Sequence, residues 1–563
     1  MPRIIDEIHP GDSGLKGKDR ADCGTIRFWR AGSGPEVYCV ERLETRSPAD
    51  LAARLAQRKR NVTMNITNSR GRTVAAGVAG LCVCLFGVVG HGQNTASGQR
   101  FGEPPVAAPR DAGVNLATKI AAPFTVATVG DVMVKRTGGA LDAPEFQGLF
   151  KLLKDADVTF GNMEGNLADV DRFEGPLRGM MGDRDVAPSL KTMGFDLMSR
   201  ANNHVFDSDQ EGMYSTIKEL DTAGIVHAGT GKNLEDARAP SFFDSPKGRV
   251  GLVAMHAPHS ANGSSSGATY QTGNIGGKPG LNPLNLTVFY HVTAEQLSAI
   301  KAVRRATYTT PAGTTNVSRL PDAASEPADR VQFLGVWYKV GTPGTRSFEM
   351  DESDLRENLR SMRNGKYLSE FMIATCHCHQ GPITGQQWLF EDQTPDFLVD
   401  LAHQSVDNGA DMFVTHGPHV LRGIEIYKGK PIFYGMGEFY YQWQHMDAAL
   451  MSGSWSQGEA RGDSDVANRV SATWRPINFE SMLAQSHYDK GKLVEIRLYP
   501  TSGAWDGPVS QLGLPRTAPP ALAQKILARV QALSKPYGTT IAIENNVGII
   551  RIDQSRATAS AGR

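Results

Sequence analysis

The sequence predicts an α/β fold, because short apolar, β-prone runs alternate along the chain with amphipathic helical segments. Five of these runs stop abruptly and are followed at once by side chains that can bind a metal ion or transfer a proton. In an open α/β sheet, ligands gather beyond the carboxyl ends of the strands, so clusters far apart in sequence can meet in one crevice. The pattern therefore predicts a hydrolase-like site that contains a metal ion. The five runs are Phe124–Gly130, Val158–Gly161, Phe195–Ala201, Phe371–Thr375 and Met412–Thr415.

Composition places the chain of 563 residues among ordinary globular proteins, since 40% of the residues are hydrophobic and 21% are charged. Lys and Arg together number 59, and so do Asp and Glu, which leaves no net charge to attract polyanions. Nucleic acid is therefore not expected as a partner. Beyond the N-terminal region the chain has only Cys376 and Cys378, too few for a disulfide framework.

The N-terminal region contains the only long apolar stretch, Thr73–Val89, with Arg70 and Arg72 before it and the small-residue segment Gly92–Gly98 after it. A positive region, an apolar core and small residues in that order are typical of a secretory signal peptide. An uncleaved membrane anchor is the alternative, because about 17 apolar residues are the lower limit for spanning a bilayer. Both interpretations of residues 64–97 predict export, to the periplasm or cell exterior or as a membrane-anchored protein.

The apolar stretch also divides the chain. We expect residues 1–63 to be a mis-assigned start or a disordered cytoplasmic tail, since Met64 is a natural start just before the arginines. A Pro- and Ala-rich linker is predicted for residues 98–122, and the main domain for residues 123–500. Residues 501–563 are predicted to form a C-terminal extension with a helix, a strand and a polar tail.

Two helices can be placed from their apolar periodicity and their ends. One is predicted to begin near Asp209 and to end at Gly224, and the other to begin near Pro395 and to end at Gly409. Such helices between strands indicate βαβ units rather than an all-β sandwich. Two segments poor in regular patterns are predicted to be long loops, Pro258–Pro283 and Gln442–Phe479.

The first two polar clusters supply oxygen ligands. Asp131 follows the first strand and could take a divalent cation directly, although a carboxylate there could equally cap the next turn. Asn162 and Glu164 follow the second strand, and they favour the metal site because such cations take oxygen donors from several separate segments.

The third cluster combines a ligand with an acid. The amide oxygen of Asn202 or Asn203 is a neutral metal ligand, and His204 beside it could protonate a leaving group as a general acid. Asp207 stands three residues later, where its carboxylate could orient the imidazole. The alternative is a turn that contains two Asn residues and an incidental His.

The fourth cluster is Cys376-His377-Cys378-His379, which resembles a zinc motif in composition. Side chains alternate faces along a strand, so the two histidines are predicted to share one face and the two cysteines the other. We favour His379 as the ligand, because the turn after it would present its side chain to the site. The fifth cluster has His416 and His419 on either side of a Gly-Pro turn, from which both could reach one cation.

These motifs together resemble the CapA family, which is associated with poly-γ-glutamate capsule biosynthesis and has a domain of the metallophosphatase-like (calcineurin-like phosphoesterase) superfamily. The resemblance covers roughly residues 123–441, with all motifs in order. The matching motifs are Gly130–Met133 (GDVM), Gly161–Gly165 (GNMEG), Ala201–Asp207 (ANNHVFD), Gly224–Gly231 and His416–Phe439.

The resemblance implies a four-layer α/β/β/α sandwich with one or two divalent metal ions, of Mn, Fe, Zn or Mg, at the strand ends. It implies that Asn162 or Glu164 bridges two ions and that His204 is the general acid. The other ligands that it implies are Asp131, Asn203, His379, His416 and His419.

Several positions depart from the superfamily pattern. Metallophosphatases carry Asp-x-His at the first strand, whereas this chain has Met133 in place of the histidine. The bridging Asp is replaced by Asn162 or displaced to Glu164, so one of two metal sites should be weaker. Glu438 stands where the family more often has Asn, and Asp209 replaces a glycine.

Three functions follow as expectations. The first is a metal-dependent hydrolase of a phosphoester or amide in envelope material, which requires His204 and Asp207 to lie within hydrogen-bonding distance. The second is a non-catalytic accessory protein that holds an anionic polymer for export, and the third is a structural subunit of a membrane synthase complex. Polymer holding predicts basic residues around the mouth of the site, for which the candidates are Lys135, Arg136, Arg172, Arg178 and Arg184.

Overall fold

The chain divides into two units, Met1–Phe101 and Gly102–Arg563. In the first unit the structure describes one antiparallel pair of strands, β1 (Thr25–Ile26) and β2 (Tyr38–Cys39). The predicted export segment Thr73–Val89 lies outside the described residues, and none of the helices that are described is long and apolar enough to cross a membrane. This computed structural model describes residues 25–26, 38–39, 116–120, 123–137, 142–258, 266–308, 325–384, 391–442, 476–504, 511 and 513–552.

The second unit is built on two large sheets. The larger sheet has ten strands, with parallel β3, β4, β7 and β8 on one side and antiparallel β22, β23, β26 and β25 on the other. The other two of the ten strands are β21, which pairs with β3, and β24, which pairs with β23. The bounds are β3 (Phe124–Met133), β4 (Val158–Met163), β7 (Leu197–Ser199), β8 (Val226–Ala228), β21 (Glu438–Tyr441), β22 (Glu480–Asp489), β23 (Lys492–Ser502), β24 (Arg516–Thr517), β25 (Ala542–Glu544) and β26 (Val547–Arg551).

The smaller sheet has six strands in the order β10-β11-β17-β18-β20-β19, of which the middle four are parallel. Every residue of β17 and β18 is buried, as expected for parallel strands that are covered on both faces and read as continuous apolar runs. The bounds are β10 (Ser241–Ser245), β11 (Gly248–Ala257), β17 (Phe371–Cys378), β18 (Met412–His416), β19 (Ile424–Tyr427) and β20 (Lys430–Phe433).

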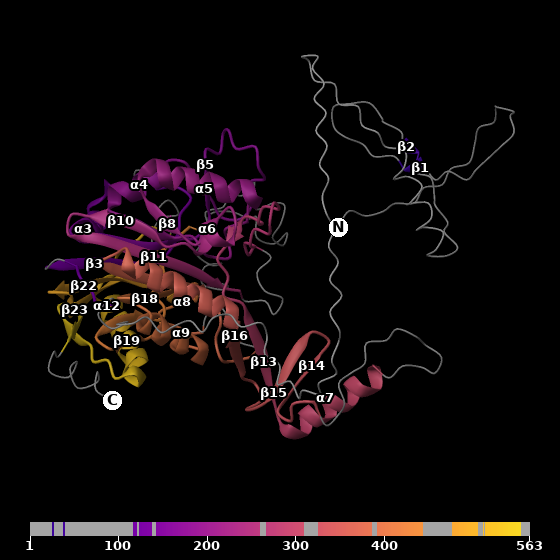
Figure 1. Cartoon of the computed structure of the whole chain (residues 1–563). Helices are drawn as coiled ribbons and strands as arrows, with labels where there is room; N and C mark the ends of the chain where they lie inside the picture. The colour runs from indigo at the N-terminus through magenta and orange to yellow at the C-terminus, as the bar shows by residue number, and fades with distance from the viewer. Residues whose placement is uncertain are drawn as a thin grey trace, which may run out of the picture. The chain divides into compact units, whose positions relative to one another are not determined.

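Helices cover the outer face of each sheet and complete four layers (Figure 1). Helices α3 (Pro144–Lys154), α4 (Val186–Met193) and α5 (Asp209–Ala223) lie on the ten-stranded sheet, and α8 (Glu352–Tyr367) and α9 (Asp396–Asp407) on the six-stranded one. The two inner faces pack against each other through one apolar core. The predicted α/β/β/α sandwich is therefore confirmed. Residues of that core include Phe124, Phe160, Leu252, Ile373 and Val414.

The two predicted helices are α5 and α9. Helix α5 begins at Asp209 and is followed by Gly224 in the left-handed conformation, with φ of 71°. Helix α9 begins at Asp396, directly after Pro395, and ends at Asp407. Both confirm the predictions made from periodicity and end signals.

The described C-terminal residues belong to the sandwich. Helix α12 (Pro520–Ser534) packs against β19 of one sheet and against β23 and β26 of the other. Its side chains Ile526, Leu527 and Val530 join the core between the sheets.

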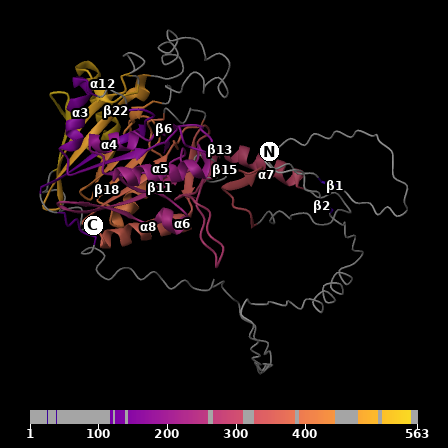
Figure 2. The same cartoon turned by 90° about the horizontal axis from the view of Figure 1, so that it is seen from above.

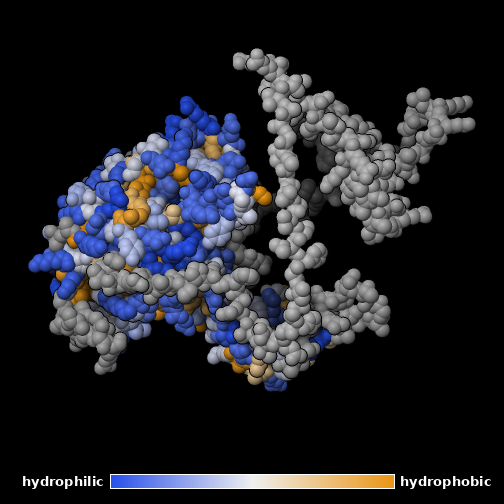
Figure 3. All heavy atoms as spheres, viewed as in Figure 1, coloured by the Kyte–Doolittle hydropathy of each residue, from blue (hydrophilic) through white to orange (hydrophobic). Residues whose placement is uncertain are grey.

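A small third sheet lies beside the layered core. Its order is β14-β15-β13-β16, and α7 packs on it; both views place β13, β15 and α7 to one side of the two large sheets (Figures 1 and 2). Phe348 of β16 contacts Phe397 of α9, with ring centroids 5.3 Å apart. The face of the second unit seen in Figure 3 is largely hydrophilic, with apolar residues in small groups. The remaining elements are β5 (Asn166–Ala168), β6 (Met181–Asp183), β9 (Thr230–Gly231), α6 (Leu234–Arg238), β12 (Gly280–Leu281), β13 (Leu286–Val292), α7 (Ala294–Thr307), β14 (Arg330–Phe333), β15 (Val336–Val340), β16 (Arg346–Met350), η5 (Pro476–Phe479) and η7 (Lys535–Tyr537).

Candidate metal centre

The polar clusters that follow the strands meet at the carboxyl ends of the parallel strands of both sheets. Asp131 on β3 is the cross-strand neighbour of Asn162 on β4 and of Glu438 on β21. His377 on β17 is the cross-strand neighbour of His416 on β18. Strand register therefore brings together residues that are up to about 300 positions apart in the sequence.

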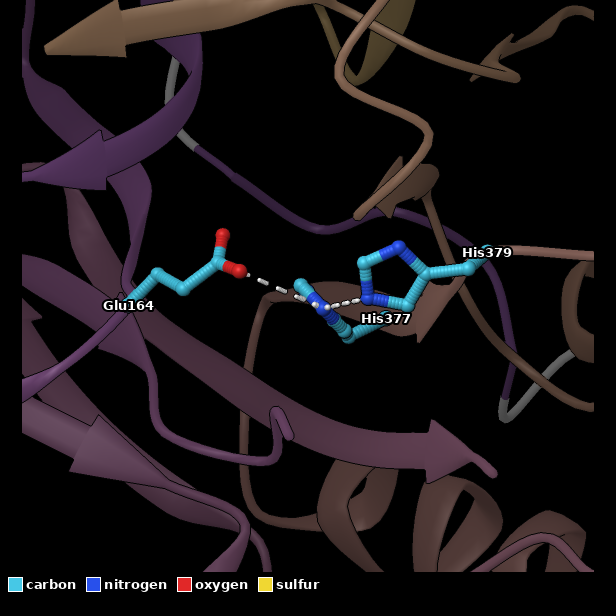
Figure 4. A group of neighbouring side chains, drawn as sticks. All are labelled: Glu164, His377 and His379. Atoms are coloured by element: carbon cyan, nitrogen blue, oxygen red, sulfur yellow. Dashed lines mark hydrogen bonds and ion pairs between the residues drawn. The ribbon is translucent and has the colours of Figure 1, made fainter. Parts of the chain in front are cut away.

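A first group of ligand atoms comes from Glu164, His377 and His379, which lie within 4.8 Å of one another and are all buried. The Nε2 atom of His377 lies 3.7 Å from Oε1 of Glu164 and 3.1 Å from Nε2 of His379. Figure 4 shows the carboxylate pointing toward the two imidazoles. The amide oxygen of Asn203 lies 2.8 Å from Nε2 of His377 and 3.2 Å from Nε2 of His379.

A second group comes from Asp131, His419 and Glu438, whose ligand atoms also lie within 4.8 Å of one another and are buried. Nδ1 of His419 lies 4.0 Å from Oδ2 of Asp131 and contacts Oε1 of Glu438. The backbone N–H of Gly417 donates to Oδ2 of Asp131 at 3.0 Å and fixes the carboxylate.

The two groups are adjacent. Nδ1 of His377, in the first group, lies 3.9 Å from Oδ1 of Asp131, in the second. Asn162 stands between them, because its Nδ2 donates to Asp131 Oδ1 at 2.8 Å and lies 3.2 Å from Nδ1 of His377. The rings of His379 and His419 have centroids 5.1 Å apart. The two groups together could hold one or two neighbouring cations.

The chemistry of these residues fits a divalent metal ion. Glu164 is completely buried, and among the described residues neither of its oxygens accepts a hydrogen bond. Burial, and then the charge of Asp131, raise the pKa of Glu164 well above its ordinary value, and the same two causes raise the pKa of Glu438. Three carboxylates buried together are costly without a neutralising cation. Burial lowers the pKa of His377 well below its ordinary value and so favours the neutral imidazole that binds metals.

The donor set is mixed. Carboxylates and imidazoles together suit Zn, Mn or Fe, and the oxygen atoms alone suit Mg. These buried acidic residues and histidines could therefore bind a divalent metal ion.

His204 and Asp207 form the predicted hydrogen-bonded pair. Nδ1 of His204 lies 2.7 Å from Oδ2 of Asp207, which also accepts a hydrogen bond from the backbone N–H of Met180 at 2.9 Å. The other ring nitrogen, Nε2, lies 3.7 Å from Oε1 of Glu164. The imidazole is thus oriented by Asp207 on one side and faces the first group on the other.

His416 joins neither group. Its Nε2 lies 3.1 Å from the carbonyl oxygen of Val129, and its Nδ1 lies 3.1 Å from Oγ1 of Thr375. Its ring also packs edge-on against Phe160, with centroids 5.6 Å apart. The structure therefore places His416 beside the two ligand groups, with both of its ring nitrogens in contact with other polar atoms.

Two members of the groups, His377 and Glu438, are not among the ligands that the sequence predicts. The turn after His379 favours that residue over His377, but strand alternation puts both histidines on the site face, while Cys376 and Cys378 pack into the core on the opposite face. Glu438 stands out in the sequence as a departure from the family pattern. A signal for it exists, since Glu438 follows an apolar run and a glycine, as Asp131 does.

Comparison with known proteins gives a family model and several relatives. The model described as "Bacterial capsule synthesis protein PGA_cap" matches residues 125–442. An uncharacterized protein, y4sH, of Sinorhizobium fredii is 34% identical over 77% of this chain and 95% of its own length. The PGA biosynthesis protein CapA of Bacillus subtilis is 21% identical over 56% of this chain and 62% of its own length. A probable polyglutamine synthesis accessory protein of Mycobacterium tuberculosis, Rv0574c, is 26% identical over 45% of this chain and 47% of its own length.

Proposed function

The chain belongs to the CapA-type bacterial capsule synthesis protein family, whose model matches residues 125–442, and on this premise we propose that it is a metal-dependent hydrolase. The bond that it cleaves is a phosphoester or an amide in capsule or other cell-envelope material. The observation that carries the proposal is the pair of adjacent buried ligand groups with the His204–Asp207 pair directed at them.

Each residue has a role in this proposal. Glu164, His377 and His379 would hold one cation, and Asp131, His419 and Glu438 a second. A bound divalent cation supplies Lewis-acid stabilisation of the negative charge that develops on a phosphoryl or carbonyl oxygen.

The proton is moved by residues of the chain itself. Asp207 accepts a hydrogen bond from the N–H of His204 Nδ1 and orients the ring, so that Nε2 can give a proton to the leaving oxygen or nitrogen. The backbone N–H of Met180 donates to the Asp207 carboxylate and holds it beside the imidazole.

A polymer-binding accessory protein is the second candidate, favoured by the name of the relative from Mycobacterium tuberculosis. It requires basic residues that are available to an anionic polymer. Arg178 is paired with Asp209 at 2.5 Å, and Arg184 with Asp169 at 2.6 Å. Arg172 also lies 3.8 Å from Asp169. The hydrolase is the better supported function, because the buried ligand groups and the His204–Asp207 pair carry it directly.

Metal analysis and a phosphodiesterase assay of the purified full-length protein test the proposal. Wild type is expected to bind one or two divalent ions per chain and to hydrolyse bis-p-nitrophenyl phosphate. Asp131→Asn should lose metal and activity together. His204→Ala should keep its metal and lose about 100- to 10,000-fold in rate, the usual contribution of a general acid. Absence of stoichiometric metal in the wild type would refute the metal centre, and metal without turnover of phosphoester or amide substrates would favour polymer binding.

We also propose that the protein is exported, on the basis of the apolar segment Thr73–Val89 and the arginines before it. Cell fractionation combined with mass spectrometry of the N-terminus tests this proposal. A cleaved product in the periplasm or medium, or an intact chain in the membrane fraction, is expected. An intact chain found only in the cytoplasm would contradict it.

A further inference from the structure

Two arginines next to the first ligand group are completely buried and have no part in the chemistry proposed above. They are Arg200, which follows β7, and Arg422, which lies between β18 and β19. Neither forms an ion pair with a carboxylate among the described residues, although a buried guanidinium is costly without a partner. Burial lowers the pKa of Arg200 to about 9, so it remains charged at neutral pH.

Arg200 binds the backbone on both sides of Glu164. Its Nη1 donates to the carbonyl oxygen of Met163 at 2.7 Å and to that of Gly165 at 2.6 Å. Gly165 has φ of +128°, so the chain turns sharply directly after the ligand. Because the Glu164 carboxylate accepts no hydrogen bond among the described residues, its place depends on the backbone that Arg200 fixes.

Arg422 plays the same part next to His379. Its Nη2 donates to the carbonyl oxygen of Gln380, the residue that follows His379, at 2.8 Å. Its Nε and Nη2 both donate to the carbonyl oxygen of Glu391, at 3.1 and 3.0 Å. The guanidinium thus ties the chain that leaves the ligand to a second segment.

We propose that Arg200 and Arg422 are positioning residues, two backbone clamps that hold Glu164 and His379 in the geometry that a cation requires. A positive charge near a cation site opposes binding by electrostatic repulsion, so the benefit of these arginines is geometric. A planar guanidinium with several donors suits this purpose, because it can bind two carbonyl oxygens from one fixed position. The inference rests on the metal centre of the proposed function and not on hydrolase activity.

Titration calorimetry of Mn²⁺ and Zn²⁺ into chelator-stripped full-length protein tests the clamps. Arg200→Met and Arg422→Met are each expected to raise the Kd for the metal by about 10- to 100-fold, the usual effect of removing a residue that orients a metal ligand. Arg200→Lys keeps the charge and one donor group but loses the planar guanidinium, and it is expected to weaken metal binding less than Arg200→Met does. It also answers the question if the methionine variant does not fold.

Lys366→Met is the matched control. Lys366 is also a fully buried cation, but it is paired with Asp411 at 2.5 Å and donates to the carbonyl oxygen of Glu370 at 2.9 Å, at the opposite end of β17 from the ligands. This variant should lower the unfolding temperature and leave the Kd of the metal unchanged. A wild type that binds metal, with Kd values equal in the folded Arg200 and Arg422 variants, would overturn the clamps alone. A wild type that binds no metal would overturn the metal centre itself.

Discussion

Gly179 packs so closely on Asp207 that any side chain at position 179 would overlap the carboxylate. Its φ is +59°, and a Cβ atom there would lie 2.0 Å from Oδ2 of Asp207. That same oxygen lies 2.7 Å from Nδ1 of His204. We therefore predict that Gly179→Ala displaces the carboxylate and lowers the hydrolysis rate by about 10- to 100-fold, as loss of an orienting partner does. Metal content should not change, and both quantities can be measured on one preparation.

Gly224→Ala separates this effect from backbone strain. Gly224 has φ of +71°, and a Cβ atom there would meet nothing within 4 Å. The substitution should cost about 1 kcal/mol in the free energy of unfolding, as expected for an L-residue in the left-handed region, and leave turnover intact. If the two alanine variants lose activity equally, the contact between Gly179 and Asp207 has no special role.

The alternation of side chains along strands predicts some of the site residues from the sequence but not others. It places His377 and His379 on the same side of the chain, and the structure has both in one ligand group at the end of β17. Alternation does not show that the ring nitrogens of His416 contact Val129 and Thr375, because the direction of a side chain beyond Cβ is decided by its neighbours. Glu438 has the same local signal as Asp131, an apolar run and a glycine before it, but its place beside Asp131 depends on the pairing of β21 with β3, which local sequence does not reveal.

At the scale of elements, one buried carboxylate joins the amino-terminal ends of β17 and β18. Asp411 accepts hydrogen bonds from Lys366 and Lys430, both at 2.5 Å, and from the backbone N–H of Met372 at 2.9 Å. Burial alone would raise the pKa of Asp411, but Lys430 and Lys366 outweigh it and hold the pKa below its ordinary value. We predict that Asp411→Asn lowers the free energy of unfolding by about 3–5 kcal/mol, because it leaves a buried lysine without its countercharge.

Urea unfolding at several pH values measures this contribution. A carboxyl group with a lowered pKa in the folded state stabilises the protein above its unfolded pKa of about 3.9 and loses this effect as the pH falls through the folded pKa. The difference between wild type and Asp411→Asn should therefore narrow below about pH 4. Asp407→Asn is the control, since Asp407 is 41% exposed and its ion pair with Lys428 is worth about 1 kcal/mol or less. Equal losses of unfolding free energy in Asp411→Asn and Asp407→Asn would mean that the burial of Asp411 adds nothing to the stability that its ion pairs provide.

At the scale of the whole molecule, the sequence predicts layers better than it predicts sheet edges. The α/β class follows from alternating strands and helices, and the four layers follow from the family resemblance. The sequence of residues 501–563 predicts an extension, because nothing in it signals a distant partner. In the structure, β26 pairs with β23, and β25 pairs with β26, so both lengthen the ten-stranded sheet. Such pairing between separate segments depends on tertiary packing and not on local propensity.

The position of α12 across both sheets predicts that the sandwich unfolds as one unit. Leu527 is fully buried in the core between the sheets, and its helix contacts β19 on one side and β23 and β26 on the other. Leu527→Ala should therefore lower the free energy of unfolding by about 2–5 kcal/mol, and both sheets should still melt in a single transition. Gln524→Ala, on the exposed face of α12, should change this free energy by about 0.5 kcal/mol or less.

Thermal melts followed by near- and far-ultraviolet circular dichroism, with and without added Mn²⁺, measure these effects. A metal that binds only the folded protein should raise the midpoint of the same transition. Two separate transitions in Leu527→Ala, of which the metal shifts only one, would mean that the two sheets fold independently.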